Sequence, residues 1–301
     1  MSEEQEIQTY IHPLDQLFLL NRELAEIIND IDEPVIVVGG QAIAYWNARF
    51  QDYMPNDENS IRAGQSTDID YIARLQDIET IVNKWGAIVA IATNHPPPQL
   101  ALSTLRDSCG KIKEHDGAKF LNIDDYLQDR VERANIVDFI DAPRGFDLRE
   151  FRDRGKLLLT TTEFDLSLVY EDFGLSDKLR ILTPISCIKS RLSNLFGGIK
   201  EPRLEVDRIK LLRVIVSIYF IELLSSGEKE RYIKKQLDYF AEVVGSTEGA
   251  KLNALYSVDL RDVFEYVATD LNLFNGKYIE KQYPYVRSHF DHTYEVALNR
   301  N

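Results

Sequence analysis

The sequence predicts an α+β fold in which a mixed β-sheet flanked by helices is followed by an all-α C-terminal domain. Short apolar runs typical of buried strands alternate with segments of helical periodicity as far as residue 182. Thr183 and Pro184 then offer a helix N-cap and a first helical residue, and only helical periodicity follows. The chain of 301 residues is long enough for two modest domains. We therefore expect a core domain with an N-terminal helix over residues 1–183 and a helical domain over residues 184–301.

The first domain is expected to contain both helices and strands. Apolar residues at helical spacing predict a helix over residues 13–30 that packs on the sheet. Val35 to Val38 are consecutive β-branched residues, which suit a buried strand. The remaining predicted segments are helices over 41–50, 77–84 and 99–110, a long loop over 51–65, a strand around Asp68 and Asp70, and strands over 87–92 (a buried one), 135–141, 156–159, 164–170 and 179–182.

The second domain is expected to be entirely helical. Its apolar positions follow the helical period, and glycine or serine residues separate the segments. Its tyrosines and phenylalanines fall at the same spacing, which indicates core packing rather than a base-stacking surface. The predicted helices cover residues 185–196, 204–224, 229–244, 259–271 and 284–298.

Composition indicates an ordinary globular protein of the cytoplasm without a membrane segment. Apolar residues make up 44% and charged residues 28% of the chain. Cys109 and Cys187 lie far apart and accompany no histidine cluster, so neither a disulfide framework nor a zinc site is expected. The acidic N-terminus is unlike a secretory signal. The longest apolar run, residues 214–224, is interrupted by Glu222 and is too short to span a bilayer.

Charge is unevenly distributed along the chain. The net charge of −14 argues against a general nucleic-acid coat protein. Residues 178–235, however, contain 13 Lys or Arg and only 6 Asp or Glu. Such a region could face a nucleotide or an RNA. Solvated helix faces would give the same pattern, and the sequence leaves both interpretations open.

Two glycines follow the predicted strand over residues 35–38. Gly39 and Gly40 allow a turn without Cβ clashes, and a backbone without side chains can approach a phosphate closely. The helix that begins at Gln41 would direct its unpaired N–H groups toward an anion. Turns of this composition are also common without any ligand. The glycine pair is therefore a candidate phosphate site that needs a second signal.

Asp68 and Asp70 supply that second signal. Side chains alternate along a strand, so both carboxylates would point to one face. Two adjacent carboxylates repel each other unless a cation lies between them, and Mg²⁺ prefers such oxygen ligands together with phosphate oxygens and water. An exposed edge strand with a hydrated polar face is the alternative. Apolar Ile69 and Ile72 favour the largely buried strand.

Asp138 is a third carboxylate in a strand-like setting. It lies among bulky apolar residues in the segment 135–141. A charge in such a place is costly unless it is paired or bound to a metal. Because perturbed carboxylates concentrate at functional sites, we treat Asp138 as a candidate site residue.

Together these stretches resemble the nucleotidyltransferase superfamily that includes DNA polymerase beta. Its pattern is a strand, Gly-Gly or Gly-Ser, a helix, Asp-x-Asp on the next strand and a third carboxylate on a later strand. The sequence looks most similar to the abortive-infection and toxin–antitoxin nucleotidyltransferases, in which an Arg and a Thr often precede the acidic pair, as Arg62 and Thr67 do here. The residue after Gly-Gly is commonly a small hydroxyl residue in such proteins, and here it is Gln41.

The resemblance implies a role for each matching residue. Asp68, Asp70 and Asp138 would hold Mg²⁺, two ions in all, and Asp138 would take the proton of the attacking hydroxyl. Nucleotide contacts are implied for Gly39, Gly40, Gln41, Arg62 and Thr67. The toxin-type enzymes also carry a Lys on the helix after the core and an Asp near the start of the following helix, and Lys189 and Asp207 match those places. An ordinary surface ion pair is the alternative for both.

The expected activity is Mg²⁺-dependent transfer of a nucleoside monophosphate from an NTP to an acceptor hydroxyl, with release of pyrophosphate. The resemblance implies tRNA or a protein as the acceptor, and a cognate antitoxin as a further partner. A small-molecule acceptor such as an antibiotic is an alternative, because small-molecule nucleotidyltransferases share this core. A catalytically inactive module that binds a nucleotide or a partner is the other alternative, because a fold alone does not establish an activity.

Overall fold

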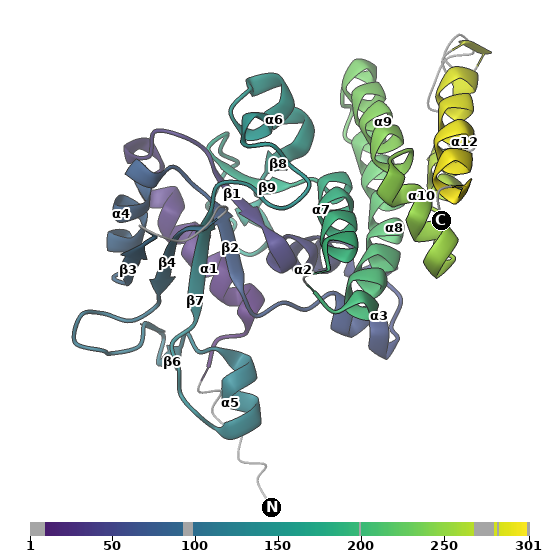
Figure 1. The fold of residues 1–301 in the computed structure, drawn as a ribbon. Coiled ribbons are helices and arrows are strands. Elements are labelled where there is room, and N and C mark those ends of the chain that lie inside the picture. The colour runs from purple at the N-terminus through teal and green to yellow at the C-terminus, as the bar shows by residue number, and fades with distance from the viewer. Residues whose placement is uncertain (1–9, 93–98, 199, 268–279, 282, 300–301) are drawn as a thin grey trace, which may run out of the picture. The chain divides into compact units, whose positions relative to one another are not determined.

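The computed structural model describes residues 10–92, 99–198, 200–267, 280–281 and 283–299. The fold is α+β, with a mixed seven-stranded sheet and helices in two compact units (Figure 1). The sheet unit comprises Met1–Tyr45, Gln65–Pro143 and Thr162–Ile181. The helical unit comprises Trp46–Gly64, Arg144–Thr161 and Leu182–Asn301.

The division into units is more interleaved than the sequence suggests. One division falls between Ile181 and Leu182, next to the boundary expected after residue 183. The helical unit also contains residues 46–64 and 144–161, which the sequence assigned to the first domain. Short segments of this kind carry no composition shift of their own, so their unit is determined by what they pack against.

The sheet has the strand order β3-β4-β7-β2-β1-β9-β8. Its strands are β1 (Val35–Val38), β2 (Ile69–Ile72), β3 (Ile88–Ile91), β4 (Gln99–Thr104), β7 (Ile136–Ile140), β8 (Thr161–Glu163) and β9 (Leu179–Leu182). The central strand β1 is antiparallel to β2 and parallel to β9, and β2 is parallel to β7. A separate hairpin joins β5 (Glu114–His115) and β6 (Ala118–Lys119), and α5 (Ile123–Asp129) follows it.

One face of the sheet packs against helices α1 (Pro13–Glu26) and α4 (Leu75–Lys84). Tyr71 of β2 and Phe139 of β7 stack with Trp85, the residue that ends α4. The hydroxyl of Tyr71 donates to Asn21 Oδ1 of α1 at 2.9 Å. Because side chains alternate along a strand, Asp70 and Asp138 point to the opposite face, where both are half-buried.

Four expectations for the sheet unit and its borders need correction. Residues 99–104 form strand β4 and not a helix, because they pair with β3 on one side and with β7 on the other. Residues 156–159 lie in helix α6 (Arg154–Thr160), which Asp153 caps by accepting from Lys156 N at 2.9 Å. The strand predicted over 164–170 is replaced by a 3₁₀ turn over Leu166–Leu168, and β3 is a half-exposed edge strand.

The stretch over residues 51–65 is not a structureless loop. It contains a 3₁₀ turn over Gln51–Tyr53 and helix α3 (Glu58–Ala63). The Asp57 side chain caps α3 by accepting from the backbone N–H groups of Asn59 and Ser60 at 3.1 Å. The helix packs on α8, so its stability comes from a partner that lies far away in the sequence.

The helical unit confirms most of the predicted C-terminal helices. They are α7 (Pro184–Gly197), α8 (Pro202–Ser225), α9 (Glu230–Val244) and α12 (Tyr283–Asn299), shown in green and yellow in Figure 1. Helix α10 (Thr247–Tyr256) was not predicted. Of the helix predicted over 259–271, α11 (Arg261–Glu265) is present and residues 268–271 lie outside the described residues. No helix in the described ranges is long and apolar enough to cross a membrane.

A buried charge cluster links α7 to α8. Glu205 is fully buried, and its Oε1 lies 3.2 Å from Arg208 Nη1 and 3.5 Å from Arg191 Nη1. Both arginines are at least nine-tenths buried. The three side chains have an excess of one positive charge in a region that excludes water. Glu205 therefore compensates the positive charge of two guanidinium groups, one on α7 and one on α8.

Candidate functional site

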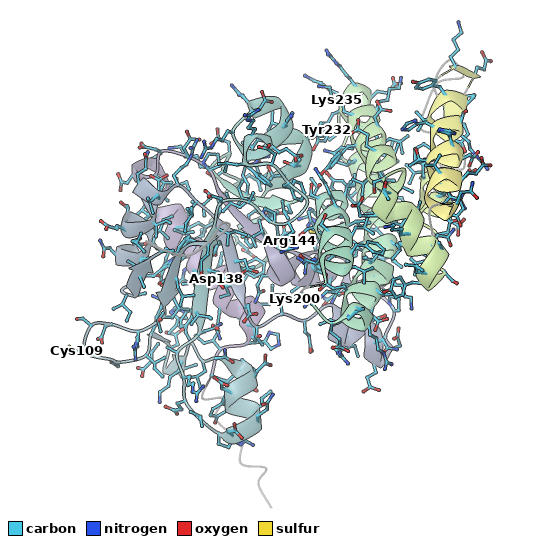
Figure 2. The ribbon with its side chains drawn as sticks, in the orientation of Figure 1. Cys109, Asp138, Arg144, Lys200, Tyr232 and Lys235 are labelled. Carbon is cyan, nitrogen blue, oxygen red and sulfur yellow. The ribbon has the colours of Figure 1, made fainter. Side chains whose placement is uncertain are left out.

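The candidate site is built on a row of residues that crosses four neighbouring strands. Val38 of β1 pairs with Asp70 of β2, and Asp70 pairs with Asp138 of β7. Leu102 of β4 is the next partner in the row. Paired residues of neighbouring strands point to the same face, so the two carboxylates lie side by side on it. Figure 2 labels Asp138 on the sheet.

Gly39 follows the last residue of β1 and lies directly beside Asp70. Its φ of +68° lies in the left-handed region, which favours glycine. A Cβ at this position would lie 1.9 Å from Asp70 Oδ2, so the carboxylate of Asp70 lies directly over the Gly39 backbone. Helix α2 (Gly39–Arg49) starts here, and its first N–H groups are unpaired within the helix. Gly39 is half-buried and Gly40 is buried, so Gly39 is the glycine that a ligand could approach.

Gly39→Ala is expected to lower any activity of this site by about 100-fold, because Asp70 or the turn must move away from the new Cβ. Gly86→Ala is the matched control. Gly86 has a φ of +63°, but a Cβ there would meet nothing within 4 Å. Both substitutions carry the left-handed strain of about 1–2 kcal/mol. Urea unfolding measures the cost of the backbone strain, and the rate of nucleotidyl transfer measures the displacement of Asp70. A Gly39→Ala protein as active as Gly86→Ala would contradict a role of Gly39 in the site.

Asp68 lies immediately before β2 and is exposed. The segment that carries it is held by two buried amides. Gln41 Nε2 donates to the carbonyl of Ser66 at 2.8 Å, and Asn135 Nδ2 donates to the carbonyl of Thr67 at 3.2 Å. Gln41 and Asn135 are both fully buried. The side-chain amide of Gln41 therefore anchors the entry to β2, a role that the sequence did not indicate.

A second layer of amides fixes Asn135 in turn. Its Nδ2 also donates to Gln16 Oε1 at 2.8 Å, and its Oδ1 accepts from the backbone of Ile136. Gln16 is fully buried in α1 and donates to the carbonyls of Ile11 and Leu121. Such satisfied networks hold a segment in one position, because breaking any member leaves a buried polar group unpaired. The network fixes the ends of β2 and β7 that carry the acidic residues.

Thr67 and Arg62 make contacts within the protein itself. Thr67 Oγ1 donates to Asp124 Oδ2 of α5 at 3.0 Å, and this links α5 to the entry of β2. Arg62 belongs to α3 of the helical unit, is exposed and pairs with Glu201 at 3.0 Å. Neither contact assigns a nucleotide role, and both roles stay predictions.

Lys189 and Asp207 belong to the helical unit as well. Asp207 lies in α8 and pairs with Lys210 of the same helix at 3.6 Å. Lys189 Nζ lies 2.8 Å from Glu150 Oε2 and 4.2 Å from the centre of the Phe146 ring. It lines a cavity of about 290 Å³ in this unit.

Tyr239 lines the same cavity. Burial raises the pKa of Tyr239, and its hydroxyl shares a hydrogen bond of 3.2 Å with the hydroxyl of Ser186. The ammonium of Lys189 therefore lies among an acid and two aromatic rings, since Tyr239 is also within 6 Å of it.

The donor set of the sheet unit suits a hard divalent cation. Mg²⁺ takes one or two carboxylates and completes its shell with water and substrate phosphates. Asp70 and Asp138 supply two facing carboxylates. In the described ranges, no three His, Cys, Asp or Glu side chains are arranged closely enough to hold a metal ion. The two neighbouring carboxylates of Asp70 and Asp138 fit a cation held by two acids together with a phosphorylated ligand.

The chain matches no protein family, no curated protein and no solved structure.

Proposed function

We propose that this protein is a Mg²⁺-dependent nucleotidyltransferase with a nucleotidyltransferase-type sheet. It transfers a nucleoside monophosphate from an NTP to an acceptor hydroxyl, most simply on tRNA or a protein. The observation that carries the proposal is the pairing of Asp70 with Asp138 directly beside the Gly39 turn. A pair of carboxylates next to a backbone that can approach a phosphate is what nucleotidyl transfer requires.

The chain's own residues would divide the work as follows. The Gly39 turn and the first N–H groups of α2 receive the phosphates of the NTP. Asp70 and Asp138 would hold Mg²⁺, which would neutralise the phosphate charge. A metal role for Asp68, at the entry to β2, rests on the resemblance alone. Asp138 accepts the proton of the acceptor hydroxyl as it attacks the α-phosphorus. Pyrophosphate leaves, so one phosphodiester or phosphate-ester bond forms as one phosphoanhydride bond breaks.

The nucleotide contacts of Thr67, Arg62, Lys189 and Asp207 rest on the resemblance alone. The resemblance also suggests the biological setting, a cytoplasmic toxin of a toxin–antitoxin or phage-defence pair with a cognate antitoxin partner. The basic stretch over residues 178–235 is consistent with an RNA acceptor.

The test is label transfer from each of the four NTPs in the presence of Mg²⁺. The acceptor is total RNA, a cell lysate or an antibiotic, each in a separate reaction. Wild-type protein is compared with Asp70→Asn and with Asp172→Asn, an exposed aspartate elsewhere in the sheet unit. Label in one acceptor with the wild type and Asp172→Asn but not with Asp70→Asn supports the proposal, and no transfer in any reaction contradicts it.

A second candidate is a catalytically inactive module that binds a nucleotide or a partner. One observation favours it: Asp138 Oδ1 already accepts a hydrogen bond from Gln99 Nε2 at 2.8 Å. A carboxylate engaged in this way can have a purely structural role. Equilibrium binding of an NTP without label transfer by the wild type would select this candidate.

A further inference from the structure

Gln99 reaches Asp138 through an irregularity in the sheet. Strand β4 begins at Gln99 and runs antiparallel to β7, and its register shifts between Gln99 and Ala101. Ala101 pairs with Phe139, so a regular ladder would place Leu100 opposite Ile140. The observed partner of Ile140 is Gln99. The strand therefore holds one extra residue at this point, as in a β-bulge.

The shift changes the face to which Gln99 points. Ile140 lies two residues after Asp138, so both point to the same face of the sheet. As the partner of Ile140, Gln99 shares that face, whereas regular pairing would turn it to the opposite one. Bulges of this kind re-aim a side chain and are frequent beside active sites. Here the re-aimed side chain ends on the carboxylate of Asp138.

The chemistry of the contact defines its effect. A carboxylate can only accept, so the amide nitrogen of Gln99 must be the group that faces Asp138 Oδ1. A donor at 2.8 Å fixes the rotation of the carboxylate. A proton acceptor needs such a fixed direction, because it must lie within hydrogen-bond reach of the proton that it takes.

We propose that Gln99 is a positioning residue for Asp138, which it orients for accepting the proton of the acceptor hydroxyl. This inference rests on the proposed function. It assigns the bulge at the start of β4 a purpose that the fold alone does not require. It also gives Asp138 a contact that differs from that of Asp70, whose carboxylate lies over the Gly39 backbone.

The variants are Gln99→Met, which keeps the length but removes the donor, and Gln99→Glu, which places a second carboxylate beside Asp138. Gln76→Met is the matched control. Gln76 also lies in the sheet unit, and its Nε2 donates to an aspartate, Asp32 Oδ2, at 2.7 Å, but it is exposed on α4. Circular dichroism melting of each variant verifies the fold before the measurements.

Two readouts are measured on the full chain. The first is the ¹H–¹⁵N signal of the Gln99 side-chain amide, assigned by its absence in Gln99→Met. Its chemical shift is expected to change in Asp138→Ala, because the carboxylate that accepts from the amide is lost. The second is steady-state kinetics, in which Gln99→Met is expected to lower kcat by about tenfold and leave KM for the NTP unchanged, because a positioning residue acts on the reacting geometry and not on NTP binding. Gln99→Glu is expected to lose more, because its like charge pushes the Asp138 carboxylate away.

The two readouts distinguish a failure of the contact from a failure of the proposed function. An unchanged Gln99 amide signal in Asp138→Ala, or an equal loss of kcat in Gln76→Met, overturns the inference. An unchanged kcat in folded Gln99→Met also overturns it, because the reaction would not need the donor. If the wild type transfers no label while the amide signal changes, the proposed function fails and the contact of Gln99 with Asp138 stands.

Discussion

Asp70→Asn and Asp138→Asn are each expected to lower nucleotidyl transfer by about 1000-fold or more while the protein stays folded. Each substitution removes a charge that would hold the cation, and several kcal/mol of transition-state stabilisation depend on that cation. The two carboxylates lie side by side on β2 and β7, so losing either one leaves a neutral amide beside the other. The measurement is the rate of label transfer at saturating NTP, with Asp172→Asn as the control.

Stability should move in the opposite direction to activity in these variants. Two like charges side by side repel each other, and an amide of the same shape relieves that repulsion. Thermal melting in the absence of Mg²⁺ is therefore expected to show equal or slightly higher midpoints for both variants. A fully active Asp138→Asn protein would assign the third-carboxylate role to another residue, and a strongly destabilised one would indicate that Asp138 is mainly structural.

Glu205→Ala is expected to destabilise the helical unit by about 3–5 kcal/mol. Removing one member of a buried ion pair leaves its partner charged in a region without water, and here Arg191 and Arg208 would both be left. Because these arginines belong to α7 and α8, the contact between the two helices is expected to loosen. Urea unfolding followed by tryptophan fluorescence and circular dichroism measures the loss.

Glu201→Ala is the matched control for this substitution. Glu201 also pairs with an arginine, Arg62, but both side chains are more than half exposed. Exposed pairs contribute about 0–1 kcal/mol, so the midpoint of unfolding should hardly change. If Glu201→Ala and Glu205→Ala cost the same, the buried cluster does not have the role that its burial indicates.

Local patterns were sufficient to predict the elements that carry the acidic residues. The four consecutive β-branched residues of β1 and the glycines after it are strong local signals, because β-branched side chains suit a buried strand and glycine suits a turn. The same holds for Asp138, whose apolar neighbours predicted strand β7 correctly. The long helices α7, α8 and α9 were predicted for a similar reason, since a sustained helical period is a strong signal.

Segments whose type depends on their partners could not be predicted in the same way. The sequence of β4 is compatible with a helix as well as with a strand. Its pairing with the two neighbouring strands determines that it is a strand. The consecutive leucines of α6 predicted a strand, but the segment is a helix with Asp153 as its N-cap. Gln99 follows the same logic, because a one-residue shift of register determines which face it reaches.

The most direct test is a crystal structure of the protein with Mn²⁺ and a non-hydrolysable NTP analogue, in which anomalous scattering locates the metal. The account predicts a Mn²⁺ peak that contacts the carboxylates of both Asp70 and Asp138, with the triphosphate against the Gly39 turn. A metal and nucleotide bound away from both aspartates, or no binding at saturating concentrations of each, would contradict it.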